Sequence, residues 1–128
     1  MKENEATYIS IIFVLLLILG VIFLSGNNKN SDINNVSIVD GKQIIEINAK
    51  GGYAPRTTTA KADIPTVIKM KTNGSFDCSS ALVIPSIGYR TNLSPKGVTE
   101  IKLSPQKPGT KLQGLCAMGM YNFSIEFN

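Results

Sequence analysis

Hydrophobic residues follow two patterns along the chain, one continuous and one alternating. Residues 8–24 are almost all apolar, and residues 11–19 contain no polar side chain. As a helix, this segment is about 25 Å long at 1.5 Å per residue, which is at the short end for a membrane span. The mixed charges of residues 2–5 and the lack of an Ala-x-Ala site are unlike a secretory signal peptide. The pattern predicts an N-terminal tail over 1–7 and an uncleaved transmembrane anchor over 8–25, with a cleaved signal as the alternative.

A polar segment separates this run from the rest of the chain. Residues 26–35 contain one apolar residue, Ile33, and show no periodicity, which is typical of a flexible tether. A coil of this length extends on the order of 20 Å, so the part beyond it is expected to reach a partner in the same membrane. The cations near the span are Lys2 on one side and Lys29 on the other, so the positive-inside rule does not decide the orientation.

From residue 36 onward apolar and polar residues alternate in short stretches that Gly and Pro interrupt. Such stretches predict β-strands. They cover residues 36–39, 43–48, 66–71, 81–84, 98–103, 111–115 and 122–127. The pair Asp40-Gly41 between the first two stretches is a strong signal for a two-residue hairpin turn. Short strands at this spacing predict an all-β fold, a Greek-key β-sandwich over residues 36–128.

The composition narrows the possible chemistry. The chain has 128 residues, of which 43% are hydrophobic and 17% charged, so one domain with a core is expected. It contains no histidine. This excludes Ser-His and Cys-His catalytic pairs, His-based zinc sites and the ligand set of ordinary blue-copper proteins. The sequence also offers no phosphate-binding loop or convincing carboxylate pair, so we do not expect an enzyme.

The predicted β domain is mildly basic. From residue 36 to the end it has eleven Lys or Arg against six Asp or Glu, a net charge of +5. The cations are scattered along the strands and are not interleaved with aromatic residues, so nucleic acid is not an expected partner. The charge fits either a solvated basic surface or a surface that steers an acidic partner.

Soft donor atoms concentrate near the end of the chain. Cys116, Met118 and Met120 occupy alternate positions, with a glycine between the methionines. On an extended backbone such side chains share a face, and on a tight loop they can converge on one point. Thiolate and thioether ligands select Cu(I) and similar soft ions, so this segment predicts a Cu(I) site. Cys78 follows the stretch over 66–71, and it would join the other sulfurs if both loops lie at the same end of the sandwich.

The spacing around these sulfurs resembles that of the cupredoxins. The run Pro105-x-x-Pro108-Gly109, a strand, and then Cys116-x-Met118-Gly119-Met120 is similar to their copper loop, which links the last two strands. The Asp77-Cys78 loop falls about where those proteins keep their first copper-binding His. Across the anchor, the tether and the sandwich, the chain most resembles the CupA-type cupredoxins. These are small bacterial copper-resistance chaperones with one N-terminal membrane anchor and a His-free domain.

This resemblance carries implications for the site and for its partner. It implies that Cys78 and Cys116 supply thiolates, and that Met118 and Met120 complete a two-copper Cu(I) site with the thioethers on its accessible side. The residues alone leave open whether one or two ions bind. It further implies delivery of Cu(I) to the metal-binding domain of a copper-exporting P-type ATPase. Since the cysteines must stay reduced to hold Cu(I), we expect the domain on the cytoplasmic face of the cell membrane.

Two other functions stay open at this point. One is an electron-transfer cupredoxin of a membrane oxidase, which the lack of histidine disfavours. The other is a binding or structural module without metal, in which Cys78 and Cys116 form a disulfide and Met118 and Met120 are flexible core residues.

Overall fold

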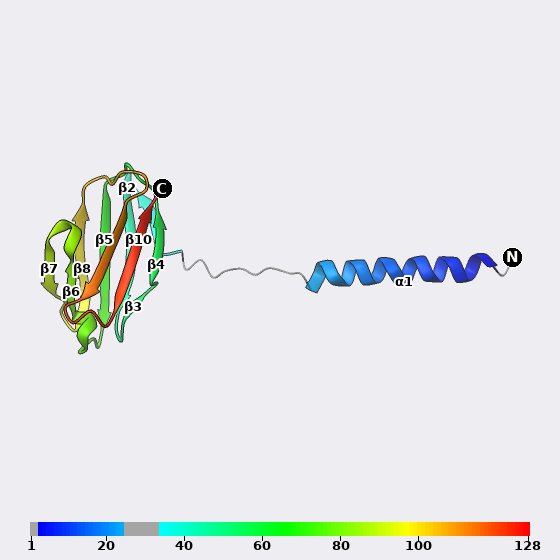
Figure 1. Ribbon diagram of the computed structural model, residues 1–128, viewed down its shortest axis with the longest axis horizontal. Coiled ribbons are helices and arrows are strands. Elements are labelled where there is room, and N and C mark those ends of the chain that lie inside the picture. Colours follow the sequence, from blue (N-terminus) through cyan, green and yellow to red (C-terminus); the bar gives the residue numbers. More distant parts are fainter. Residues whose placement is uncertain (1–2, 25–33) are drawn as a thin grey trace. The chain divides into compact units, whose positions relative to one another are not determined.

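The computed structural model describes residues 3–24 and 34–128, which belong to two units of the chain (Figure 1). The first unit holds the helix α1, Glu3–Leu24, and the second holds every strand that the structure describes. The tether predicted over residues 26–35 lies outside the described residues except for its last two positions.

The continuous apolar run near the N-terminus forms the helix α1, which begins at Glu3, earlier than the predicted start at residue 8. Among residues 3–24 and 34–128, however, no helix is both long enough and apolar enough to cross a membrane. The structure therefore confirms one N-terminal helix, whereas it does not support the transmembrane anchor predicted over 8–25.

Residues 34–128 form two five-stranded β-sheets, which confirms the predicted β-sandwich. One sheet has the order β1-β2-β5-β8 with β3 paired to β2, and the other has the order β4-β10-β9-β6-β7. The strands are β1 (Val36–Val39), β2 (Lys42–Ala49), β3 (Tyr53–Ala54), β4 (Thr57–Ala60), β5 (Thr66–Asn73), β6 (Ala81–Ile84), β7 (Tyr89–Asn92), β8 (Lys96–Leu103), β9 (Lys111–Cys116) and β10 (Asn122–Phe127). Two 3-10 helices, η1 (Cys78–Ser80) and η2 (Pro85–Ile87), flank β6.

All seven predicted strands form, and the structure contains three further strands, β3, β4 and β7, that the alternation of apolar and polar residues did not predict. Strand β4 is Thr-Thr-Thr-Ala and buries alternate residues without any large apolar side chain, so its sequence gives little signal. Strand β7 is mostly polar and lies at an edge of its sheet, and β3 has two residues. These strands depend on their neighbours for pairing more than on their own sequence.

The predicted hairpin between β1 and β2 is confirmed. Asp40 and Gly41 both have left-handed backbone angles, with φ of 51° and 75°, as a two-residue hairpin of this twist requires. Strand β2 then buries every second residue, beginning at Gln43. The side-chain amide of Gln43 forms hydrogen bonds with the backbone of Lys61 and the hydroxyl of Thr66, so this buried polar group is satisfied.

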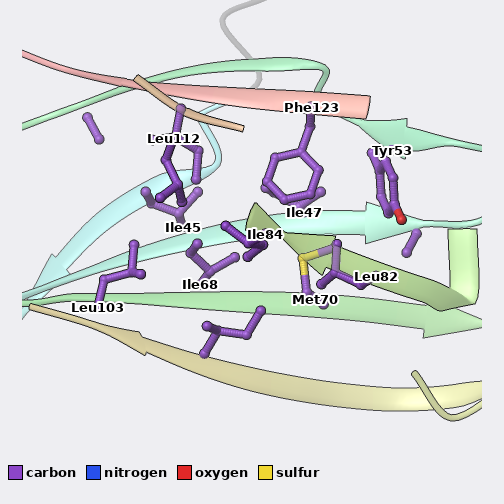
Figure 2. Close-up of a cluster of buried hydrophobic side chains, with 14 of the residues drawn as sticks. Ile45, Ile47, Tyr53, Ile68, Met70, Leu82, Ile84, Leu103, Leu112 and Phe123 are labelled. Carbon is purple, nitrogen blue, oxygen red and sulfur yellow. The ribbon is translucent and has the colours of Figure 1, made fainter. Parts of the chain in front are cut away.

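The core lies between the inner faces of the two sheets (Figure 2). Completely buried side chains come from alternate positions of strands in both sheets: Ile45, Ile47, Ile68 and Met70 from one, and Leu82, Ile84, Phe123, Ile125 and Phe127 from the other. The rings of Tyr53 and Phe123 meet edge to face with centroids 5.1 Å apart. This arrangement is favoured between aromatic rings, and it connects β3 of one sheet with β10 of the other.

Strand β9 approaches the ring of Phe123 so closely that it needs a glycine at residue 114. A methyl group on Gly114 would overlap the Phe123 ring, which is completely buried and cannot move aside freely. Phe123 is also the residue directly opposite Gly114 in the pairing of β9 with β10. The lack of a side chain at Gly114 therefore allows the ring of Phe123 to pack directly against β9.

We expect Gly114→Ala to lower the free energy of unfolding by about 1–3 kcal/mol, the usual cost of overpacking a core. Denaturant unfolding followed by near-ultraviolet circular dichroism measures this change, because packed aromatic rings such as Tyr53 dominate that signal and the exposed Tyr8 of α1 contributes little. Adding Phe123→Leu should recover part of the loss by making room for the methyl group. A double variant that loses the full sum of both single effects would contradict the steric explanation.

Candidate metal centre

The two cysteines meet at one end of the sandwich. Cys78 opens η1 after β5, and Cys116 ends β9. They stand 38 positions apart in sequence, yet their Cα atoms are 5.7 Å apart and a disulfide joins their sulfurs. The structure thus brings together Cys78 and Cys116, which were expected to meet only if their loops lie at the same end of the sandwich. We call this the sulfur end; in Figure 1 it is the end at which β5 finishes and β10 begins.

The pairing of β6 with β9 fixes the position of Cys116. Leu82 pairs with Cys116 across the two strands, and the amide of Ala117 donates to the carbonyl of Ala81 at 2.8 Å. Cys116 is completely buried. A slip of one residue in this register would turn its side chain to the opposite face of the sheet. Since η1 leads directly into β6, the same register sets the distance between the cysteines.

A tight turn follows Cys116 and leads into β10. The amide of Gly119 donates to the carbonyl of Cys116 at 2.8 Å, and Gly119 adopts a φ of +73°, which glycine accepts without strain. The amide of Tyr121 donates to the sulfur of Cys116 at 3.4 Å. A hydrogen bond of this kind favours the charged form of a sulfur ligand once the disulfide is reduced.

Met118 and Met120 lie on this turn with their side chains directed to solvent. They are 78% and 64% exposed, respectively. The interpretation of these methionines as flexible core residues is therefore wrong, in contrast to Met70, which is completely buried. The structure joins the two cysteines and leaves both thioethers accessible beside them.

Asp77 holds the turn that carries Cys78. Its carboxylate caps η1 by accepting hydrogen bonds from the Ser79 amide, at 2.9 Å, and from the Ser79 hydroxyl. The other carboxylate oxygen accepts from the amide of Gly51. These bonds, above all the one from the Ser79 hydroxyl, lower the pKa of Asp77. The carboxylate therefore serves the turn and joins it to the loop between β2 and β3.

Tyr53 supports the same turn from inside the core. Its hydroxyl donates to the carbonyl of Ser79 at 3.0 Å. Burial, and then the negative charge of Asp77, raise the pKa of Tyr53 to about 12. Sequence reasoning assigns Tyr53 no role at the site, because its partner Ser79 lies 26 positions away and only the tertiary fold brings the two residues together.

The available donor atoms favour a soft monovalent ion. Within residues 3–24 and 34–128, no group of three or more His, Cys, Asp or Glu could hold a metal ion. Two cysteine sulfurs with two neighbouring thioethers are the donor set that the sulfur end offers once the disulfide is reduced. Sulfur donors of this kind suit Cu(I), so the residues present fit that ion.

Comparisons with known proteins agree with the fold described above. A family model for a cupredoxin-like domain matches residues 14–126, whereas a comparison with curated proteins finds no match. The structure is similar to the metal-binding domain of the Streptococcus pneumoniae Cu(I)-exporting P-type ATPase CopA, solved with Cu(I). The TM-score is 0.65 and the identity 24%, over 73% of this chain and 92% of that chain. It is also similar to a copper-binding protein solved in the apo form by NMR, with a TM-score of 0.66 and 22% identity, over 73% and 94% of the two chains.

We expect Tyr53→Phe to destabilise the sulfur end by about 1 kcal/mol, since the ring stays packed and one buried hydrogen bond is lost. The pKa of Tyr53 is raised in the folded state, so its contribution is complete below pH 10 and is lost as the pH rises toward 12. The free energy of unfolding measured across this range should fall more steeply in the unsubstituted chain than in the variant. Tyr89→Phe is the control, and parallel profiles for the unsubstituted chain and Tyr53→Phe would contradict the assignment.

Proposed function

Because the chain belongs to the cupredoxin-like domain family, we propose that it binds Cu(I) through sulfur and passes the ion to a copper-exporting P-type ATPase. The proposed ligands are Cys78, Cys116, Met118 and Met120, holding one or two ions. The observation that carries this proposal is the meeting of the two cysteines beside an exposed turn that bears both methionines. Two proteins of similar fold support the choice of metal, a CopA metal-binding domain solved with Cu(I) and a copper-binding protein.

The chemistry begins with reduced cysteines. Two electrons and two protons from the thiol pool of a reducing compartment convert the disulfide to two thiols, which lose their protons when they bind the ion. Two thiolates and neutral thioethers stabilise Cu(I) and offer little to Cu(II), whose preferred imidazole ligands the chain lacks. We therefore propose a carrier of Cu(I), and we do not propose electron transfer or catalysis.

The exposure of the four sulfur residues supports release in one direction. Cys116 is completely buried and Cys78 is half-buried, whereas Met118 and Met120 are mostly exposed. Thioethers are neutral and bind Cu(I) more weakly than thiolates do, so an incoming thiolate would displace them first. Transfer is then an exchange of ligands in which copper keeps its oxidation state. The thiolates of buried Cys116 and half-buried Cys78 would hold the ion until the incoming ligand has replaced the thioethers.

We place the domain in a reducing compartment, at the cytoplasmic face of the cell membrane, where the cysteines stay available for copper. Helix α1 would provide the attachment. Its large apolar side chains between Tyr8 and Leu19 are exposed, and a helix without a polar face needs an apolar partner, either lipid or protein. Held in this way, the domain would serve copper resistance by collecting Cu(I) close to the exporter.

The disulfide supports a second candidate, a binding or structural module that holds no metal. A bond between residues 38 positions apart restricts the unfolded chain and stabilises the fold by about 4 kcal/mol in the chain-entropy description. In that case the sulfurs would be oxidised in the working protein, and the sulfur end would have a structural role.

We expect the reduced, full-length chain to take up one or two equivalents of Cu(I) in an anaerobic titration against a chromophoric competitor. A variant with Cys78→Ser and Cys116→Ser should take up none, because both thiolates are gone. A variant with Met118→Leu and Met120→Leu should weaken the more exposed ion about tenfold or more and leave the inner ion bound. Met70→Leu is the matched control, since it removes a thioether from the core alone. Uptake that survives the loss of both cysteines would refute the proposed ligands.

The state of the thiols separates the two candidates. In intact cells, a membrane-permeant maleimide should modify both cysteines of copper-depleted protein, and an impermeant one should not, because the site is reduced and cytoplasmic. The chain should sediment with the membrane fraction. Cysteines that resist the permeant reagent until a reductant is added would instead favour the structural disulfide.

A further inference from the structure

The sulfur end displays apolar side chains that a solvated domain does not need. Phe76 is 84% exposed and lies two residues before Cys78, while Met118 lies two residues after Cys116. Met120 and Val98 are exposed at the same end. In the described part of the β unit, the other exposed large hydrophobic residues are Ile38, Val39 and Ile87, and they lie toward the opposite end. A local concentration of exposed apolar groups is typical of an interaction site.

Cations line two clefts at the sulfur end. Lys50 and Arg56 line a cleft of about 350 Å³ together with Met120 and Tyr121. Lys50 also lines a neighbouring cleft of about 530 Å³, in which the other exposed cation is Lys96. The two clefts share Lys50, and we call Lys50, Arg56 and Lys96 together the rim.

The charges of this rim are not neutralised by ion pairs. The three ion pairs of residues 3–24 and 34–128 engage Lys69, Lys71 and Lys111, and none engages Lys50, Arg56 or Lys96. Asp77 is the nearby carboxylate, and its oxygens accept hydrogen bonds from Gly51 and Ser79. Three cations without an ion pair against one carboxylate leave the surface around the methionine turn positive.

We propose that the sulfur end is a docking surface for an acidic protein that receives the Cu(I). Phe76, Met118 and Met120 would contact the metal-binding loop of the partner, and Lys50, Arg56 and Lys96 would pair with carboxylates around that loop. An apolar centre inside a charged rim is the usual arrangement of a protein interface, and complementary charge accelerates encounter. This docking role rests on the proposed function, because it names the kind of partner that takes the ion.

Two other occupants fit the surface less well. A second copy of the chain would oppose the same three cations to one another, which costs free energy. An anionic lipid surface matches the charge, but it would cover the methionine turn and separate the thioethers from any acceptor. An acidic protein is the one occupant that uses both the charge and the accessibility of the sulfurs.

The test reverses charge at the rim and, as a matched control, at the opposite end. The rim variant is Lys50→Glu with Arg56→Glu, and the control is Lys102→Glu with Lys107→Glu, two exposed lysines that make no ion pair among the described residues. Both full-length variants have the same net charge. Neither pair belongs to the proposed ligand set, so both variants keep all four sulfur residues, and each is loaded with a measured amount of Cu(I) before transfer is compared.

The acceptor probe is a synthetic peptide with a Cys-x-x-Cys pair between glutamates, and its neutral counterpart has glutamines in their place. Stopped-flow transfer of Cu(I) to the acidic peptide at low salt should slow about tenfold in the rim variant, and the control should stay close to the unsubstituted chain. The difference should shrink with the neutral peptide and at high salt. Equal rates for the rim and control variants would overturn the docking surface while leaving the copper site intact.

Binding without copper keeps the two proposals separate. Fluorescence anisotropy of the labelled acidic peptide, measured with the metal-free chain, should show weaker binding to the rim variant than to the control. If the chain loads no Cu(I), the proposed function fails, and the anisotropy still decides whether an acidic segment docks here. Weaker flotation of the rim variant with phosphatidylserine vesicles, together with unchanged peptide binding, would assign the surface to lipid and overturn the proposal. Self-association of the unsubstituted chain that the rim variant changes would assign it to a second copy.

Discussion

The register between β6 and β9 is the constraint on which the sulfur end depends. Leu82 pairs with Cys116, and the amide of Ala117, directly after β9, donates to the carbonyl of Ala81. This pairing buries the sulfur of Cys116 and brings η1, with Cys78, directly beside it. Core packing also holds β9 in place. Gly114 lets β9 lie against the ring of Phe123, and that ring packs against Tyr53. The position of the cysteines is therefore a property of the whole sandwich.

Side chains outside the proposed ligand set hold the site in shape. Asp77 ties the Cys78 turn to the loop between β2 and β3, and Tyr53 ties it to the core. Both act through hydrogen bonds to backbone groups around the Cys78 turn, and so they restrict the motion of Cys78. The methionine turn is held by the bond from the Gly119 amide to the Cys116 carbonyl and by the bond from the Tyr121 amide to the Cys116 sulfur, while both methionine side chains lie exposed. A firmly held inner side and an accessible outer side suit an ion that has to be kept and then passed on.

The sequence predicts those features of the fold that depend on neighbouring residues, namely the strands of the core and the first hairpin turn. The alternation of apolar residues identifies β2, β5 and the other strands of the core, and the left-handed angles of Asp40 and Gly41 follow from their residue types. The sequence also identifies the sulfurs as candidates for one site. It could not supply the contact of Tyr53 with Ser79 or that of Asp77 with Gly51, each of which spans 26 positions, nor the polar strands β4 and β7, which depend on pairing. The apolar N-terminal run predicts α1 correctly as a helix, while the membrane span inferred from the same run is not supported.

X-ray absorption at the copper edge, recorded on the reduced and copper-loaded chain, tests the central claim most directly. A site built from Cys78, Cys116, Met118 and Met120 predicts an edge typical of Cu(I) and neighbours that are all sulfur. Loss of the methionines should remove part of the sulfur signal and leave the cysteine contribution in place. Nitrogen or oxygen neighbours around the bound copper, or an edge typical of Cu(II), would contradict the account.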